Sequence, residues 1–342
     1  MKKRLALLLA GALVVSSLTA CGGNAGNNAA KVKLGLGAVT SFASSKSIGE
    51  DNYGKPLEAT NAQVDITVAA VTLDENGKIV SCQIDAIQTK VSVDGTGAIA
   101  ADNATQFTSK YDLKDGYAMK SASPIGKEWY EQIDVYEQWC VGKTADEVKA
   151  GVAENGAPSD EALLTGCTIK VGDIAAAVAD ACAKAVDSDA TAADTLGIAL
   201  IGELSSPKNA AENEGKGSYQ AYVNFAAVTQ KDGKITASLI DSIQATPTWG
   251  ADGVLTTNVD QDVRTKYTKQ GDYGMQKASS LANGEWFQQI DVFKQSIVGK
   301  TADEVAAIAV DEKGYPTDET LKTGCTMKVA AYKTVVVKAL GK

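Results

Sequence analysis

Residues 128–148 read EWYEQIDVYEQWCVGKTADEV, and residues 285–305 read EWFQQIDVFKQSIVGKTADEV. At this offset of 157, 15 of the 21 positions are identical, which is far too many for chance. The likeness continues outward, because residues 77–79 recur as 233–235 and residues 165–168 recur as 323–326. A repeat of this length predicts a pair of domains rather than a solenoid. We therefore predict two tandem copies of one domain, residues 31–187 and 195–342, joined by a linker at 188–194 and able to fold separately.

Each copy reads as strands followed by helices. Residues 63–72 alternate and are rich in β-branched side chains, 74–77 have the composition of a turn, and 78–88 return as a second strand; residues 219–244 repeat this hairpin. Trp129, Ile133, Tyr136 and Cys140 then fall on one face at helical spacing. The sequence predicts an α+β fold in which each copy is a hairpin-built antiparallel sheet packed with helices.

The letters Gly142-Lys143-Thr144 resemble the end of a nucleotide-binding P-loop. That loop needs another glycine five positions before Gly142, because its amides wrap the phosphates, and Glu137 stands there instead. A glycine that ends one helix, followed by a threonine that begins the next, explains the same letters. Thr144 and Glu147 then form a capping box.

The composition excludes several kinds of site. The chain has no histidine, which rules out Ser-His-Asp hydrolysis, His-ligated haem and the common His-containing zinc sites. Its 33 basic and 42 acidic residues give a net charge of −9, which argues against a nucleic-acid binder. No C-x-x-C motif occurs, and no nucleophile–base pair can be named. We therefore predict no metal ligands and no catalytic residues, and a hydrolase is a poor candidate.

The first 30 residues have the pattern of an exported, lipid-anchored protein. A basic segment at 1–4 precedes an apolar segment at 5–15, and Leu18-Thr19-Ala20-Cys21 resembles the lipobox of bacterial lipoproteins. We predict a signal peptide at 1–20, lipid on Cys21, and a flexible tether at 21–30 that is rich in Gly and Asn. The mature protein is then expected on the extracellular face of the cell membrane. The alternative is an ordinary secretory signal with an incidental cysteine.

Setting Cys21 aside leaves five cysteines, at positions 82, 140, 167, 182 and 325. Because five is an odd number, at least one thiol is unpaired within the chain.

The Thr-Gly-Cys-Thr segments at 165–168 and 323–326 occur once per copy, ahead of an Ala/Val-rich final helix. Together with the lipobox and the tandem hairpin-led domains, they make the chain resemble the FMN-binding domains of extracellular electron-transfer lipoproteins in Gram-positive bacteria. In that family the segment reads Ser/Thr-Gly-Ala-Thr, and its last threonine is esterified to the phosphate of FMN. The resemblance implies covalent FMN on Thr168 and Thr326, with Gly166 and Gly324 in the binding turns.

The resemblance further implies a lipid-anchored flavoprotein that passes electrons outside the membrane, an electron carrier rather than a turnover enzyme. Its implied partners are a flavin transferase and a quinone-reducing partner in the membrane. The alternative is a cofactor-free surface lipoprotein that binds a small molecule or a cell-envelope partner. Trp129 and Trp286 are interpreted as core aromatics, with flavin stacking by one of them as the alternative.

Overall fold

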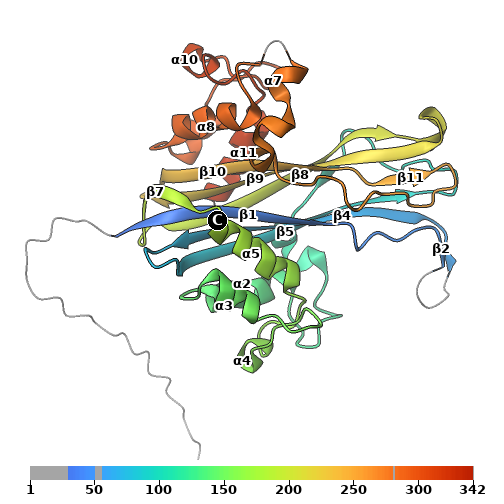
Figure 1. The fold of residues 1–342 in the computed structure, drawn as a ribbon, viewed down its shortest axis with the longest axis horizontal. Helices are drawn as coiled ribbons and strands as arrows, with labels where there is room; N and C mark the ends of the chain where they lie inside the picture. Colours follow the sequence, from blue (N-terminus) through green and yellow to red (C-terminus); the bar gives the residue numbers. More distant parts are fainter. Residues whose placement is uncertain (1–29, 51–55, 280–281, 342) are drawn as a thin grey trace, which may run out of the picture.

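A computed structural model describes residues 30–50, 56–279 and 282–341. Two antiparallel sheets lie face to face at the centre, and helices cover the outer face of each sheet, so the molecule has four layers (Figure 1). The α+β class predicted from the sequence is confirmed. The predicted signal peptide, Cys21 and all but the last residue of the predicted tether lie outside the described residues.

The two sheets are built by different halves of the chain. The first has the strand order β5-β4-β1-β7, and the second has the order β10-β9-β8-β6, with β11 also paired to β9. The strands of the first sheet are β1 (Lys31–Ser41), β4 (Thr60–Leu73), β5 (Ile79–Val93) and β7 (Val186–Thr191). Those of the second are β6 (Gln106–Phe107), β8 (Thr195–Lys208), β9 (Lys216–Lys231), β10 (Lys234–Ala245) and β11 (Thr248–Gly250). A short pair, β2 (Gly49–Glu50) with β3 (Pro56–Leu57), stands apart.

The helices of the second half repeat the order of those in the first, with two additions, η2 and α7. The first half contains α1 (Lys110–Leu113), η1 (Lys114–Tyr117), α2 (Trp129–Cys140), α3 (Ala145–Ala150), α4 (Glu161–Leu164) and α5 (Gly172–Ala183). The second contains η2 (Ala210–Glu212), α6 (Lys266–Lys269), η3 (Gln270–Tyr273), α7 (Met275–Ala278), α8 (Trp286–Ile297), α9 (Ala302–Ala306), α10 (Glu319–Lys322) and α11 (Ala330–Leu340).

The largest apolar core lies between the two sheets and belongs to both halves. Val64, Ile66 and Val68 from β4 are fully buried in it, together with Val223 and Phe225 from β9. Separate cores lie between each sheet and its own helices. Separate folding of the halves stays a prediction from the sequence, and the shared core argues against it because the inner face of each sheet needs the other sheet to cover it.

The predicted linker at 188–194 overlaps a strand of the first sheet. Its first four residues belong to β7, which pairs antiparallel with β1, so the connection between the halves is part of the first sheet. A strand of the first half also belongs to the second sheet. β6, from the first half, pairs with β8 of the second through Gln106–Glu203 and Phe107–Gly202.

The helix predictions hold in detail. Trp129, Ile133, Tyr136 and Cys140 all face the core from α2. The capping box of Thr144 and Glu147 is present at the start of α3. The strands β1 and β8 were not predicted. The Thr-Gly-Cys-Thr segments follow the short helices α4 and α10 as turns and irregular backbone.

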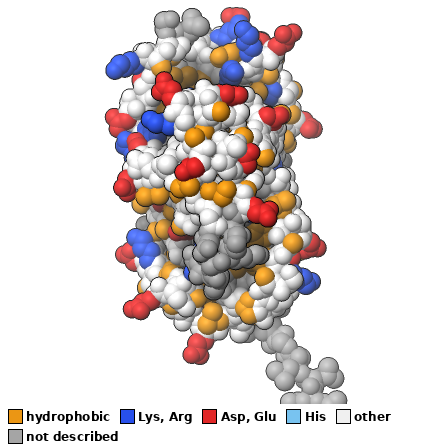
Figure 2. Space-filling model, turned by 90° about the vertical axis from the view of Figure 1, so that its right-hand side faces the viewer, with side chains coloured by type: hydrophobic (Ala, Val, Ile, Leu, Met, Phe, Trp, Pro, Cys, Tyr) orange, Lys and Arg blue, Asp and Glu red, His pale blue; other side chains and the backbone are white. Residues whose placement is uncertain are grey.

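Charged side chains of both signs are spread over the end face of the sandwich, and apolar ones gather in a band across its middle (Figure 2).

Turns from the two halves also meet across the sandwich. The indole N–H of Trp249 donates to the carbonyl of Gly97 at 3.0 Å, and Thr60 Oγ1 donates to the carbonyl of Gly253 at 2.5 Å. No helix of the described residues is long and apolar enough to cross a membrane.

Gly197 lets α11 lie directly on β8. A Cβ atom at this position would stand 2.1 Å from the carbonyl oxygen of Ala339, which is backbone and cannot turn away. We expect Gly197→Ala to lower the free energy of unfolding by about 3 kcal/mol, at the upper end of overpacking costs. Gly172→Ala is the matched control, because nothing lies within 4 Å of its added Cβ. Urea denaturation of both variants measures the difference in their free energies of unfolding. Equal urea midpoints for the two variants would contradict the close packing of α11 on β8.

Candidate functional site

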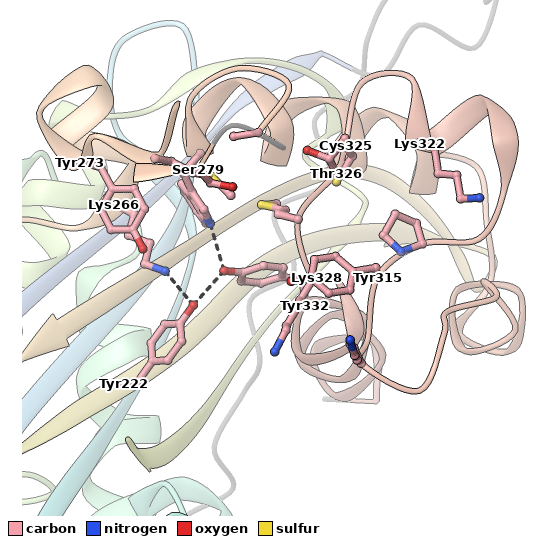
Figure 3. A pocket seen from close by; sticks show the side chains of 16 residues that line it. Tyr222, Lys266, Tyr273, Ser279, Tyr315, Lys322, Cys325, Thr326, Lys328 and Tyr332 are labelled. Carbon is pink, nitrogen blue, oxygen red and sulfur yellow. Dashed lines mark hydrogen bonds between the residues drawn. The ribbon is translucent and has the colours of Figure 1, made fainter. Parts of the chain in front are cut away.

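A cavity of about 780 Å³ lies in the second half beside the Thr-Gly-Cys-Thr segment (Figure 3). Five aromatic side chains form much of its wall: Tyr222, Tyr273, Trp286, Tyr315 and Tyr332. Trp286 and Tyr332 are buried at its floor, whereas Tyr315 is 37% exposed. Aromatic walls of this kind suit a flat ring system, since stacked rings bury a large apolar area.

The charged side chains that line the cavity are all lysines. Lys313, Lys322 and Lys328 are exposed, and Lys266 is only 4% exposed. No aspartate or glutamate is among the described residues of the lining. In a chain whose net charge is −9, a cavity with lysines and no carboxylates favours an anionic ligand.

Thr326 lines this cavity and is held in place by a buried glutamine on α8. Its backbone N–H and its hydroxyl both donate to Oε1 of Gln289, at 2.8 and 3.2 Å. The backbone N–H of Asn283 donates to the threonine hydroxyl at 3.1 Å. Gln289 is fully buried, and its own amide donates to the carbonyl of Gly284 at 2.9 Å. The hydroxyl therefore has one fixed position in the cavity wall.

Thr168 in the first half is held in the same way. Its N–H and hydroxyl donate to Oε1 of Gln132 at 2.8 and 3.3 Å. The preceding glycines pack on valines of the same helices: a Cβ on Gly166 would lie 2.8 Å from Val135, and one on Gly324 would lie 2.9 Å from the corresponding valine, Val292. Only glycine fits at these two positions without a shift.

The cysteine of each Thr-Gly-Cys-Thr segment points away from solvent. Cys167 and Cys325 are fully buried in the cores under the helices. Burial raises the pKa of each thiol to about 11, so both are neutral thiols. All five cysteines of the described residues are free.

A chain of hydrogen bonds crosses the floor of the cavity. Nζ of Lys266 donates to the hydroxyl of Tyr222 at 2.7 Å, and that hydroxyl lies 3.3 Å from the hydroxyl of Tyr332. The indole N–H of Trp286 also donates to Tyr332, at 3.1 Å. The dashed lines of Figure 3 mark this path. Burial raises the pKa of both tyrosines, so their hydroxyls keep their protons at neutral pH.

Lys266 is held in the cavity by the start of α6. The side chain of Thr265 caps this helix, and the buried carboxylate of Asp241 accepts the backbone N–H of Tyr267 at 2.9 Å. Burial lowers the pKa of the Lys266 amine to about 7. Burial also raises the pKa of Asp241 to about 6.

The lysine predicts a pH dependence of stability. Its pKa is about 7 in the folded protein and about 10.4 when unfolded, so between these values the unfolded chain binds the additional proton. The free energy of unfolding should therefore rise with pH, by up to about 1.4 kcal/mol per pH unit. We expect Lys266→Met to lose this rise, so that the free energy of unfolding of the wild type increases by roughly 2 kcal/mol relative to that of the variant from pH 7 to 9. Urea denaturation at both pH values measures this difference. An equal change in the free energy of unfolding of the two proteins would contradict the burial of the amine.

The corresponding place in the first half has different side chains. The equivalent aspartates give the register: Asp241 pairs with Phe225 in the second sheet, and Asp85 pairs with Val68 in the first. Tyr222 lies three residues before Phe225, and Asp65 lies three residues before Val68, so Asp65 is the counterpart of Tyr222. Counted from the two cysteines, four further aromatic or charged cavity residues are also replaced: Lys313 by Asn155, Tyr315 by Ala157, Lys322 by Leu164, and Tyr332 by Ile174. The first half thus lacks three aromatic rings and two cations that the second half supplies.

The structure places the predicted residues in two separate groups. Thr326 and Gly324 lie beside the cavity, whereas Thr168 and Gly166 lie on the opposite outer layer. Both tryptophans are buried in the helix-side cores, as interpreted, although Trp286 also reaches the cavity. Sequence reasoning missed Gln289, Lys266 and the tyrosines. The recurrence of Gln-Ile-Asp-Val at 132–135 and 289–292 was the available signal for the glutamine.

Among the described residues, no group of three or more Cys, Asp or Glu side chains is placed to hold a metal ion. A chlorophenol reductase of Desulfitobacterium hafniense is 30% identical to this chain over 145 residues. The match covers 38% of this chain and 42% of that protein, so the chain spans less than half the length of this relative. No family model matches the chain, and neither does a solved structure.

Proposed function

We propose that this protein is a flavin carrier that holds FMN in the cavity of its second half and passes electrons at the outer face of the membrane. One observation carries the proposal. The cavity combines the fixed hydroxyl of Thr326, aromatic walls and four lysines, with no carboxylate among its described lining residues. FMN offers the matching chemistry, since it has a flat aromatic ring system and an anionic phosphate.

The residues present fit the group. A volume of about 780 Å³ lies within the usual range of ligand pockets, about 300–1,000 Å³. Thr326 would carry the phosphate ester, and Lys322 and Lys328, which line the same cavity, would offset its charge. Trp286 and Tyr315 would bind the ring system. When bound, FMN supplies the redox chemistry, and the protein supplies binding and orientation.

Gln289 would prepare Thr326 for modification. Because Oε1 of Gln289 accepts both the N–H and the hydroxyl of Thr326, it fixes the side-chain rotamer and directs the hydroxyl proton toward itself. Cys325, next to this threonine, is fully buried and also lines the cavity, where it stands in place of the smaller alanine of the family segment.

The proposal places one flavin on each chain, on Thr326. Thr168 has the same glutamine contact, but in the first half Leu164 occupies the sequence position that Lys322 has in the second. We therefore expect Thr168 to remain unmodified, which revises the expectation of one flavin on each half. The name of the relative in Desulfitobacterium hafniense states a reductase activity, and this supports a redox role for our chain as well.

The lipid anchor is part of the same proposal. Diacylglycerol on Cys21 would keep the carrier next to a quinone-reducing partner in the membrane. We expect Cys21→Ala to leave an unprocessed precursor, because the lipobox requires the modified thiol for cleavage. Immunoblots of membrane and soluble fractions check this, with Cys182→Ala as the control. Cleavage of the variant at the same bond would refute the lipoprotein assignment.

The proposal is tested by the visible absorption spectrum of protein co-expressed with a flavin transferase. We expect a flavin spectrum in the wild type, reduced strongly in Gln289→Ala and retained in Gln132→Ala, its counterpart in the first half. A colourless wild-type protein would favour the alternative, a cofactor-free lipoprotein that binds a small molecule or a cell-envelope partner.

A further inference from the structure

The amine of Lys266 is the most unusual group in the cavity. The side chain is 4% exposed, and it points between two tyrosine rings whose centroids lie 4.3 Å (Tyr222) and 4.8 Å (Tyr273) from Nζ (Figure 3). In the part of the chain that the structure describes, no carboxylate lies within ion-pair distance of this amine. The residue lines the cavity, so a ligand can reach it from inside.

The surroundings of Lys266 favour a free amine at neutral pH. Burial lowers its pKa to about 7, and the charge of Lys269 on the same helix acts in the same direction. Asp241 on β10 and Glu203 on β8 act in the opposite direction without overcoming the burial. A desolvated lysine with a large uncharged fraction is a good nucleophile toward carbonyl carbon.

We propose that Lys266 forms an imine with a planar aromatic aldehyde that carries a phosphate group. The amine of Lys266 forms the C=N bond, and Trp286 and Tyr315 provide the surface on which the ring stacks. The exposed lysines of the cavity contact the phosphate. The reactivity belongs to chains whose cavity holds no flavin. It therefore goes beyond the proposed function and does not depend on it.

The step is balanced without an oxidant or reductant. The nitrogen lone pair attacks the carbonyl carbon, and the electrons of the C=O π bond move to oxygen. The nitrogen then gives up two protons, the oxygen takes up two and leaves as water, and a C=N bond remains. The hydroxyl of Tyr222, 2.7 Å from Nζ, is placed to relay these protons.

Lys110 in the first half is the natural comparison. Its Nζ lies 4.9 Å from the ring centroid of Tyr117 and 5.6 Å from that of Trp129, much as Lys266 lies over Tyr273 and Trp286. Asp65 replaces the tyrosine that contacts Lys266, and Lys110 is only partly buried. The two lysines thus share their position in the repeat but differ in their surroundings.

The experiment uses the flavin-free full chain, pyridoxal 5′-phosphate as the aldehyde, and borohydride to reduce the imine to a stable amine. Peptide mapping by mass spectrometry locates the phosphopyridoxyl group. At pH 7 we expect labelling at Lys266 to be at least roughly tenfold faster than at exposed lysines, since an ordinary lysine has a pKa of about 10.4 and little free amine at this pH. Lys266→Arg should lose this label, and Lys110→Arg should keep it.

Two results would overturn the proposal. One is labelling spread over exposed lysines with Lys266 unmodified in the wild type, a result that needs no variant to fold. The other is a labelling rate at Lys266 that still rises tenfold per pH unit above pH 8, as for an ordinary lysine. A rate that levels off near pH 7 supports it. Because no arm of the experiment uses flavin, its failure is distinct from a failure of the flavin proposal, which the visible spectrum reports.

Discussion

Cutting the chain between β7 and β8 is expected to leave neither half able to fold as a monomer. Residues 30–193 would expose the inner face of the first sheet, including Val64, Ile66 and Val68, and residues 194–342 would expose that of the second. A buried large apolar side chain contributes about 1.5–3 kcal/mol. Exposing five such side chains of an inner face would cost roughly 8–15 kcal/mol. This cost equals the whole stability of a typical domain, about 5–15 kcal/mol.

Circular dichroism and sedimentation of the two fragments measure this, with the uncut chain 30–342 as the control. We expect no cooperative monomeric transition for either fragment alone, and recovery of native signal when the fragments are mixed. Cooperative unfolding of each fragment as a monomer would restore the sequence-based view of two independent domains.

Thr326→Ala is expected to abolish covalent flavin, and Thr168→Ala to leave it unchanged. Both threonines have the same contacts with a buried glutamine, so the two variants lose the same hydrogen bond. They differ in what surrounds the hydroxyl, because only Thr326 lines the cavity with its lysines and aromatic rings. Flavin fluorescence of the denatured protein in a gel reports the covalent bond. Equal loss in both variants would mean that the cavity does not select the site.

Much of the fold was predictable because the repeat and the helix signals are local. The spacing of Trp129, Ile133 and Tyr136 on α2 and the capping box at Thr144 depend only on neighbouring residues. The packing of sheet against sheet depends on residues far apart in the sequence. One signal was available: residues 66–71 of β4 are apolar or small at both alternating sets of positions, as expected for a strand buried on both faces.

The candidate site was only partly predictable for the same reason. The Thr-Gly-Cys-Thr segment indicated Thr326, but nothing local to it indicates Lys266 or Tyr222, which come from α6 and β9. The repeat of Gln-Ile-Asp-Val now has a physical reading. Gln289 holds Thr326, Ile290 is in the core, Asp291 accepts from the hydroxyl of Tyr267, and Val292 lies against Gly324.

The mass of the intact wild-type protein after co-expression with a flavin transferase is the most direct test of the account. We predict one population heavier than the unmodified chain by a single FMN less one water, because the cavity at Thr326 combines the hydroxyl with five aromatic rings and four lysines. Two additions would contradict the assignment to the second half alone. An unmodified mass would contradict the flavin itself.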